Sequence, residues 1–229
     1  QVSRQIIAAV LLVVGFAVFV SLGVWQLQRL EWKQGILAEI EAQIGADPVA
    51  LPAAPTPEAD KYRPVRVDGT FEPGELLVLV SSRDFGAGFR AISPFTAADG
   101  RRILVDRGFL RTEARDASRS FGSAELEGNL HWPDERVGST PEDDVVGNWW
   151  YARDVDKMAA HLGTEPVLVV ARTRTDPGLL PMPVTTDGIR NRHLEYAMTW
   201  FLFAATWAVM TGFALWRIRR RTAGSERAG

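Results

Sequence analysis

The three histidines are the side chains best suited to chemistry in this sequence, which contains no cysteine. His193 opens the stretch "NRHLEYAMTWFLFAA", where polar residues give way within a few positions to aromatic and aliphatic ones. His161 falls in the last turn of a predicted helix, where a positive charge suits the helix dipole. His131 precedes Trp132 and is expected to be a hydrogen-bonded surface residue. Neither has a second metal-type residue at ligand spacing, so no zinc site is predicted.

Motifs of well-known enzyme classes do not occur in the sequence. It has no G-x-S-x-G elbow, no P-loop, no dinucleotide-binding glycine motif after a strand and no H-E-x-x-H. The acidic pairs Asp143 with Asp144 and Glu125 with Glu127 are expected to be solvated surface charges. The lack of cysteine excludes structural disulfides, thiol redox chemistry and thiolate metal sites. The protein is therefore predicted not to be an enzyme.

The segment that contains His193 belongs to one of two apolar runs, each long enough to cross a bilayer. Residues 6–27 and 194–218 are expected to be transmembrane helices, since a span needs about 20 apolar residues. The first run lacks a small-residue cleavage site, so a retained anchor is expected rather than a signal peptide. Arginines cluster directly after the second run and continue into residues 219–229. This basic tail predicts that both termini lie in the cytoplasm and that the region between the spans is exported.

The region between the spans is expected to hold one folded domain. Residues 28–195 carry 27 acidic and 20 basic side chains, which argues against a nucleic-acid partner. The first span is predicted to continue as an amphipathic helix to about residue 45, followed by a Pro/Ala-rich linker over 46–61. Short alternating strands over 62–190 predict an antiparallel β-rich domain, either a sheet or a small barrel. One short helix is predicted there, with Asp154 as N-cap and Gly163 just past its end. The fold class is thus an α+β membrane protein.

The helical phase of the second span places His193 on a distinctive face. Ala204, Ala208 and Gly212 form a ladder of small residues that would let another helix approach closely. Trp200 and Tyr196 are expected to form a flat aromatic surface next to the imidazole. The residues expected on this face are His193, Ala197, Trp200, Ala204 and Thr211, with Ala208 close beside it.

Such a face could grip a planar apolar ligand with an iron atom at its centre, with His193 as the axial ligand. Trp25, Gln26 and Arg29 end the first span and reach the same level if the spans are antiparallel neighbours. Arg29, together with Arg190 and Arg192, could pair with the propionates of a porphyrin. The alternative is that His193 is an interfacial anchor, since amphipathic side chains are common at membrane boundaries.

These two membrane-edge stretches, "LGVWQLQRLEWK" and "NRHLEYAMTWFLFAA", resemble signatures of the surfeit locus protein 1 family. "YRPVRVDGTF", "GFRAISPF", "ILVDRGFL", "EGNL" and "NWWYARDVDKMA" are similar to that family's domain motifs, in the same order. One departure is Asp106, where the family often has asparagine.

The resemblance implies a multi-pass protein of the bacterial inner membrane, or of the mitochondrial inner membrane, with a periplasmic or intermembrane-space domain. It also implies a non-catalytic role in the biogenesis of the respiratory chain, as an assembly factor for haem-copper cytochrome c oxidase. For bacterial members it implies binding of haem a through a histidine that corresponds to His193. The implied partners are haem a synthase, which supplies haem a, oxidase subunit I, which receives it, and the lipid bilayer.

Two hypotheses follow. The first is a haem a chaperone that inserts haem a into subunit I, with the cofactor site formed by His193, Trp200, Tyr196, Trp25, Gln26, Arg29 and Arg192. The second is a cofactor-free, membrane-anchored scaffold that stabilises an assembly intermediate through exposed aromatic residues such as Trp149, Trp150 and Tyr151. A membrane-anchored enzyme would require a deep polar pocket with perturbed carboxylates.

Overall fold

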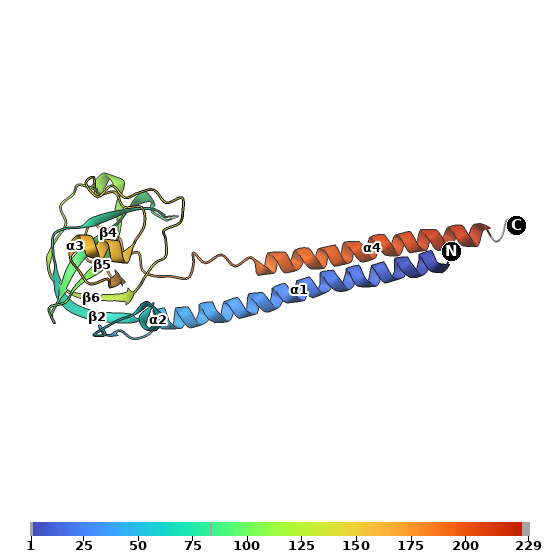
Figure 1. Cartoon of the computed structure of the whole chain (residues 1–229), viewed down its shortest axis with the longest axis horizontal. Helices are drawn as coiled ribbons and strands as arrows, with labels where there is room; N and C mark the ends of the chain where they lie inside the picture. The colour runs from blue at the N-terminus through green and yellow to red at the C-terminus, as the bar shows by residue number, and fades with distance from the viewer. Residues whose placement is uncertain (1, 83, 226–229) are drawn as a thin grey trace. The chain divides into compact units, whose positions relative to one another are not determined.

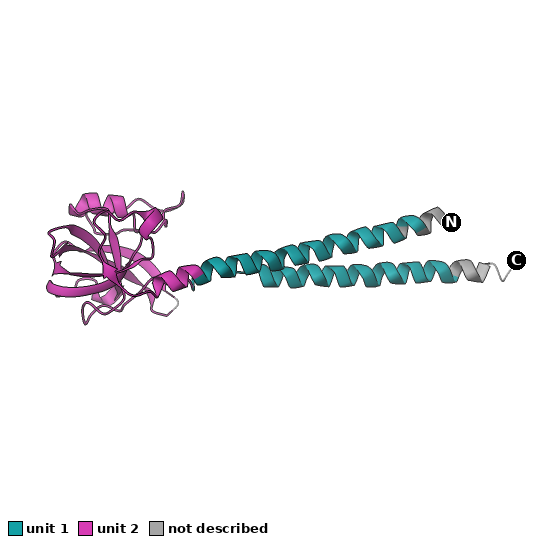
Figure 2. Ribbon diagram, turned by 90° about the horizontal axis from the view of Figure 1, so that it is seen from below, with its two compact units in different colours: residues 1–38, 187–229 teal, residues 39–186 magenta. Residues whose placement is uncertain are grey.

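The computed structural model describes residues 2–82 and 84–225, in two compact units. Residues 1–38 and 187–229 belong to unit 1, and residues 39–186 form unit 2 (Figure 2). Each unit has its own architecture. Helices make up most of unit 1, and a β-sheet makes up most of unit 2.

Unit 1 is built from two helices, α1 (Val2–Ile44), whose last turns belong to unit 2, and α4 (His193–Ser225), which run side by side in opposite directions (Figure 1). Both are long and apolar enough to cross a membrane, over Ala9–Ile44 and His193–Arg220, which is compatible with membrane anchoring. The first expected span and the amphipathic helix after it are thus one continuous helix. The second helix begins at His193 itself.

Unit 2 is a small β-barrel, one of the two forms that the strand pattern allows, and it carries the short helix predicted near its C-terminal end. Strands β2, β6, β7, β5 and β4 pair in that order, and β2 also pairs with β4, which closes the ring. β3 extends β4 as a hairpin, and β1 lies beside β2. The pairings β1–β2 and β5–β7 are parallel, and the others are antiparallel. The strands are β1 (Val49–Ala50), β2 (Pro64–Phe71), β3 (Leu76–Ser82), β4 (Gly86–Ala97), β5 (Arg102–Arg111), β6 (Gly122–Leu130) and β7 (Leu168–Ala171).

Closure of the barrel depends on β4 and Gly69. A register shift between Arg90 and Ile92 bends β4, and its far end pairs with β2. At this seam a Cβ on Gly69 would lie 2.3 Å from the carbonyl oxygen of Thr96, so only glycine permits the approach. Inside the ring, Phe71 packs edge-on against Phe95 at 4.8 Å between ring centroids, and both rings are buried.

A second core lies outside the barrel, under helix α3 (Val155–Leu162). Met158 of α3 is fully buried with Leu104 and Leu168 of the barrel strands, so β5 and β7 have apolar neighbours on both faces. The predicted caps are confirmed. Asp154 accepts a hydrogen bond from the Lys157 amide at 3.2 Å, and Gly163 adopts a left-handed conformation.

The range 46–61, expected to be a Pro/Ala-rich linker, contains two short regular elements. Helix α2 (Pro57–Asp60) forms one turn, with Thr56 as N-cap and Pro57 at its start. An amide hydrogen at this position would have no partner within the helix, so proline, which lacks it, is well accommodated. Strand β1 falls in the same range and pairs with only one strand, β2. A 3₁₀ turn, η1 (Thr112–Ala114), follows β5.

Candidate functional site

His193 is the first residue of α4, and its imidazole contacts the side chain of Gln26 on α1. The His193 Nδ1 atom lies 2.8 Å from Gln26 Oε1, and both side chains are half-buried. An amide oxygen only accepts hydrogen bonds, so this contact is a hydrogen bond when Nδ1 carries the ring proton, and Nε2 then keeps a free lone pair. A neutral imidazole binds a metal through such a lone pair.

The phase of α1 explains why Gln26 points at α4. Along α1, residues spaced three or four apart are less exposed than most of their neighbours. This is the pattern of two helices packed along a seam. This inward-facing stripe contains Leu12, Gly15, Phe19, Gly23, Gln26 and Leu30.

The facing stripe of α4 agrees with the phase read from the sequence. Ala197 and Ala204 are almost fully buried, at 1% and 3% exposure, and His193, Trp200 and Thr211 on the same face are partly buried. The small-residue ladder is only partly right, because Gly212 is exposed and a Cβ there would meet no atom within 4 Å.

The closest approach of the helices occurs instead at glycines of α1. A Cβ on Gly15 would lie 2.4 Å from the indole nitrogen of Trp207, and one on Gly23 would lie 2.6 Å from the Phe201 ring. The Trp207 indole also donates to the Leu12 carbonyl at 3.3 Å. Sequence reasoning missed these glycines, although two glycines eight residues apart in an apolar run were visible.

The aromatic residues expected beside the imidazole do not form one flat surface. Trp200 stacks on Phe19 of α1 at 6.1 Å between centroids and is half-buried in the helix pair. Tyr196 is 53% exposed on another face of α4. Trp200 therefore supports the position of the helices at this level, and Tyr196 remains accessible.

The remaining predicted site residues lie on the exposed surface near this end of unit 1. Trp25 is about half exposed, and the Arg29 guanidinium lies over the Trp32 ring at 4.7 Å. Arg192 is 4.0 Å from the Glu195 carboxylate. The backbone carbonyl of Arg190 accepts a hydrogen bond from Lys33 at 2.6 Å, and the Arg190 residue is exposed. Among the described residues, Gln26 is the one whose side chain is within hydrogen-bond distance of the His193 ring.

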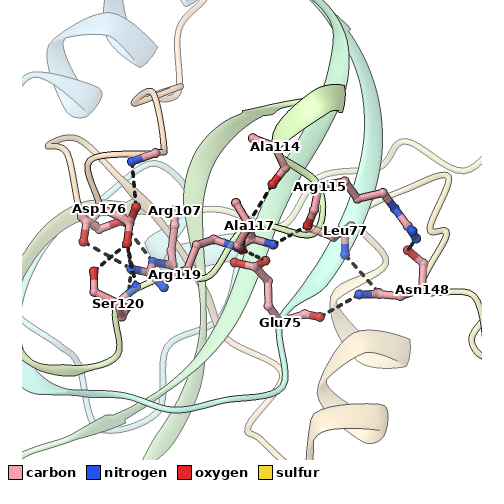
Figure 3. Close-up of polar contacts among 12 residues, drawn as sticks. Glu75, Leu77, Arg107, Ala114, Arg115, Ala117, Arg119, Ser120, Asn148 and Asp176 are labelled. Carbon is pink, nitrogen blue, oxygen red and sulfur yellow. Dashed lines mark hydrogen bonds and ion pairs between the residues drawn. The ribbon is translucent and has the colours of Figure 1, made fainter.

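Unit 2 contains a second group of polar contacts, shown in Figure 3. Arg119 binds the Glu75 carboxylate and donates to the carbonyls of Ala114, Ala117 and Arg115. Asn148 holds β3 through the Leu77 amide and the Glu75 carbonyl. These contacts fasten the segment after β5 to β3, a structural role.

Glu75 also lines a hollow of about 370 Å³, and burial raises the pKa of its carboxyl against the opposing charge of Arg119. A perturbed carboxyl beside a hollow is a feature of active sites. Here the neighbouring arginines are occupied by backbone carbonyls, and no histidine lines the hollow.

Asp106 lies in a buried ionic cluster. Its side chain is fully buried and accepts hydrogen bonds from Arg90 at 2.6 Å and Arg153 at 3.1 Å. Arg153 also binds Glu135, and despite the opposing effect of burial these partners hold the pKa of Arg153 above its usual value. The cluster ties β4 and β5 to the segment that leads into α3.

Three expectations about unit 2 are wrong. Asp143 is not a solvated charge, because its side chain is fully buried against Arg136 and Lys157. Trp150 is 1% exposed in the core under α3, so it cannot be part of an exposed aromatic surface. His131 is half-buried, with Nδ1 lacking a hydrogen-bond partner, rather than hydrogen-bonded at the surface.

Metal sites built from several ligands are not found in the part of the chain that the structure describes, where no group of three or more His, Cys, Asp or Glu residues could hold an ion. His161 is exposed at the end of α3, edge-on to Trp150. His193 is therefore the histidine whose surroundings best suit a single axial bond to a metal.

Comparisons with known proteins cover the barrel and parts of both helices. The model of the SURF1 family matches residues 13–205, a range that includes Gln26 and His193. Surfeit locus protein 1 of Rattus norvegicus is 34% identical over 210 residues, covering 81% of this chain and 69% of that protein. The Homo sapiens protein of the same name is 34% identical over 222 residues, covering 86% and 74%. A SURF1-like protein of Monosiga brevicollis is 34% identical over 226 residues, covering 90% and 85%.

Proposed function

The chain belongs to the SURF1 family, and on that basis we propose that it is an assembly factor for haem-copper cytochrome c oxidase. Its task in this proposal is to bind haem a as a cargo and aid its insertion into subunit I. The observation that carries the proposal is the contact between His193 and Gln26 at the edge of the helix pair. The role is that of a chaperone and not of an enzyme.

The residues at this site fit the proposed cargo. Haem iron accepts an imidazole nitrogen as axial ligand, and the hydrogen bond at Nδ1 of His193 leaves Nε2 available for it. The rings of Tyr196 on α4 and Trp25 on α1 are both about half exposed and offer apolar area near the level of His193 and Gln26 in the sequence. The guanidinium groups of Arg29 and Arg192 are exposed and suited to pair with propionate carboxylates.

A single axial ligand from the protein also suits transfer. A cargo protein must release what it binds, and one exchangeable bond on an open face of a helix pair is easier to break than two bonds in a closed pocket. Haem a synthase is the proposed source of the cargo and subunit I its destination. Both are membrane partners, which agrees with a site at the end of apolar helices.

The proposed location is the bacterial inner membrane, with unit 2 in the periplasm. The arginines after the second apolar run favour the cytoplasmic side, and Arg217, Arg219 and Arg220 are exposed on α4. Two spans then put both termini in the cytoplasm.

Replacement of His193 by alanine tests the proposal directly. We expect wild-type protein, purified in detergent from cells that make haem a, to carry nearly one haem a per chain. His193→Ala should lose most of this haem or change its visible spectrum, because the iron loses its nitrogen ligand. His161→Ala, which removes an exposed histidine from unit 2, is the matched control and should keep the wild-type spectrum.

A colourless wild-type protein, or an unchanged spectrum in His193→Ala, would contradict haem binding at this site. The cofactor-free scaffold would then be the better proposal. Its docking surface would have to exclude the buried Trp150.

A further inference from the structure

We propose that Gln26 is a positioning residue that holds His193 as the Nδ1–H tautomer and keeps its bond to iron weak enough for transfer. The inference rests on the proposed function and names a determinant of cargo release. Its basis is the 2.8 Å contact between His193 Nδ1 and Gln26 Oε1, which joins the two helices across 167 residues of sequence.

The position of Gln26 is fixed by the packing of the helices. It lies on the inward-facing stripe of α1, one turn beyond Gly23, where the Phe201 ring of α4 lies close to the α1 backbone. Below it, Phe19 stacks on Trp200. Contacts on this side restrict movement of α1 against α4, so the amide of Gln26 stays within reach of the imidazole.

The hydrogen bond selects one form of the imidazole. A neutral imidazole has one donor nitrogen and one acceptor nitrogen, and the partner of one decides the role of the other. With the Gln26 oxygen as acceptor, Nδ1 must donate. The lone pair of Nε2 then remains for a metal.

The neutrality of Gln26 tunes how strongly that lone pair binds. Groups that accept a hydrogen bond from a ligating histidine raise its basicity, and a carboxylate does so most because it carries a full negative charge. An uncharged amide polarises the ring less, so the iron bond stays weaker. It also avoids placing a charge at the end of an apolar segment, where charge is costly.

The first experiment reads the tautomer without haem. Nitrogen-15 NMR of histidine-labelled protein in nanodiscs gives a pair of ring-nitrogen signals for each of the three histidines, and His193→Ala identifies the pair required. Above the titration range of the ring we expect the proton on Nδ1 in wild type and a mixture of tautomers in Gln26→Leu. A wild-type signal with the proton on Nε2 would overturn the inference.

The second experiment compares haem a affinity, reduction potential and the rate of haem transfer to an excess of apomyoglobin. Gln26→Leu should weaken haem a binding by about 10- to 100-fold, the usual cost of losing such a partner. Gln26→Glu should bind more tightly, lower the reduction potential and slow the transfer. The matched control is Gln28→Leu, which alters an exposed glutamine of the same helix and should behave as wild type.

The two proposals fail in different ways. If His193→Ala loses haem a but both Gln26 variants match wild type, the role of Gln26 is refuted and the proposed function stands. If wild type binds no haem a, the proposed function fails, and the NMR measurement still decides whether Gln26 fixes the tautomer.

Discussion

His131 and His193 are both partly buried, but their surroundings lead to different properties. The His131 ring stacks on Tyr62 at 5.5 Å, and its Nδ1 is buried without a hydrogen-bond partner. The pKa of His131 is lowered to about 4. Burial is the main cause, and the charges of Arg153 and Lys61 add to it, while the Glu135 carboxylate opposes it. His193 instead has a hydrogen-bond acceptor on a neighbouring helix. His131 is therefore a neutral structural residue, whereas His193 is the proposed ligand of the iron.

The lowered pKa of His131 predicts how stability depends on pH. In the unfolded chain the imidazole takes up a proton near its ordinary value of 6.5, whereas in the folded protein it does so only near 4. The folded state thus loses stability as the pH falls from 6.5 to 4, on the order of 2 kcal/mol from this group. Unfolding of wild type and His131→Gln by urea, followed across this pH range in detergent, checks the prediction.

His131→Gln should lack this part of the pH dependence, and His161→Gln should retain it. If wild type and His131→Gln lose stability in parallel as the pH falls, His131 is not responsible. Asp143 contributes in the same direction at lower pH. Burial opposes its ionised form, but hydrogen bonds from Lys157 and Tyr151 hold the pKa of its carboxyl below the ordinary value.

Individual side chains of unit 2 were the hardest to predict from sequence. Asp143 and Asp144 are adjacent acidic residues, yet only Asp143 is buried, because Lys157 and Arg136 reach it from other segments. Trp149 and Trp150 are likewise adjacent, but Trp150 alone enters the core under α3. Such differences depend on contacts between distant parts of the chain, which residue types and spacing do not reveal.

The elements themselves were easier to predict, because each has a periodic pattern or a cap that is local in sequence. The face of α4 with His193 and Ala204 and the caps of α3 are examples. The strand pattern is compatible with a sheet or a barrel, since closure depends on the pairing of β2 with β4 across the Gly69 seam. The close approach at Gly15 and Gly23 is not evident from sequence, because it depends on Trp207 and Phe201 of the other helix.

Gly23 is predicted to determine how closely α1 and α4 approach each other. Gly23→Leu would drive a side chain into the Phe201 ring, and overpacking of this kind costs about 1–3 kcal/mol. The chain has no cysteine, so Phe19→Cys with Phe203→Cys gives a clean pair, at positions whose rings lie 5.9 Å apart. A short bifunctional thiol reagent should join this pair in high yield, and much less so when Gly23→Leu is added.

The matched control for this experiment is Gly212→Leu, at an exposed glycine of α4 with no neighbour for a Cβ. It should leave the cross-linking yield unchanged. Equal yields with Gly23→Leu and Gly212→Leu would show that the glycine of α1 does not control the approach of the helices.

The whole molecule combines two apolar helices with an acidic domain that has no cysteine. The proposed orientation predicts that unit 2 can be labelled from outside the cell membrane. Val146 is fully exposed, so Val146→Cys should react with a membrane-impermeant maleimide in intact spheroplasts. Arg219→Cys, beyond the second apolar run, should react only after the membrane is permeabilised. The opposite pattern would place unit 2 in the cytoplasm.

The order of strands in the barrel also bears on how the protein is made. Strand β7 lies between β5 and β6, yet it comes last in sequence among the strands of the described residues, so the ring cannot close until Ala171 has been synthesised. His193 follows only 22 residues later, and at 5–20 residues per second it is synthesised about 1–4 s afterwards. The proposed haem ligand is therefore synthesised after every strand of the ring, so in the proposed role a nascent chain would take up its cargo only once all of these strands have been made.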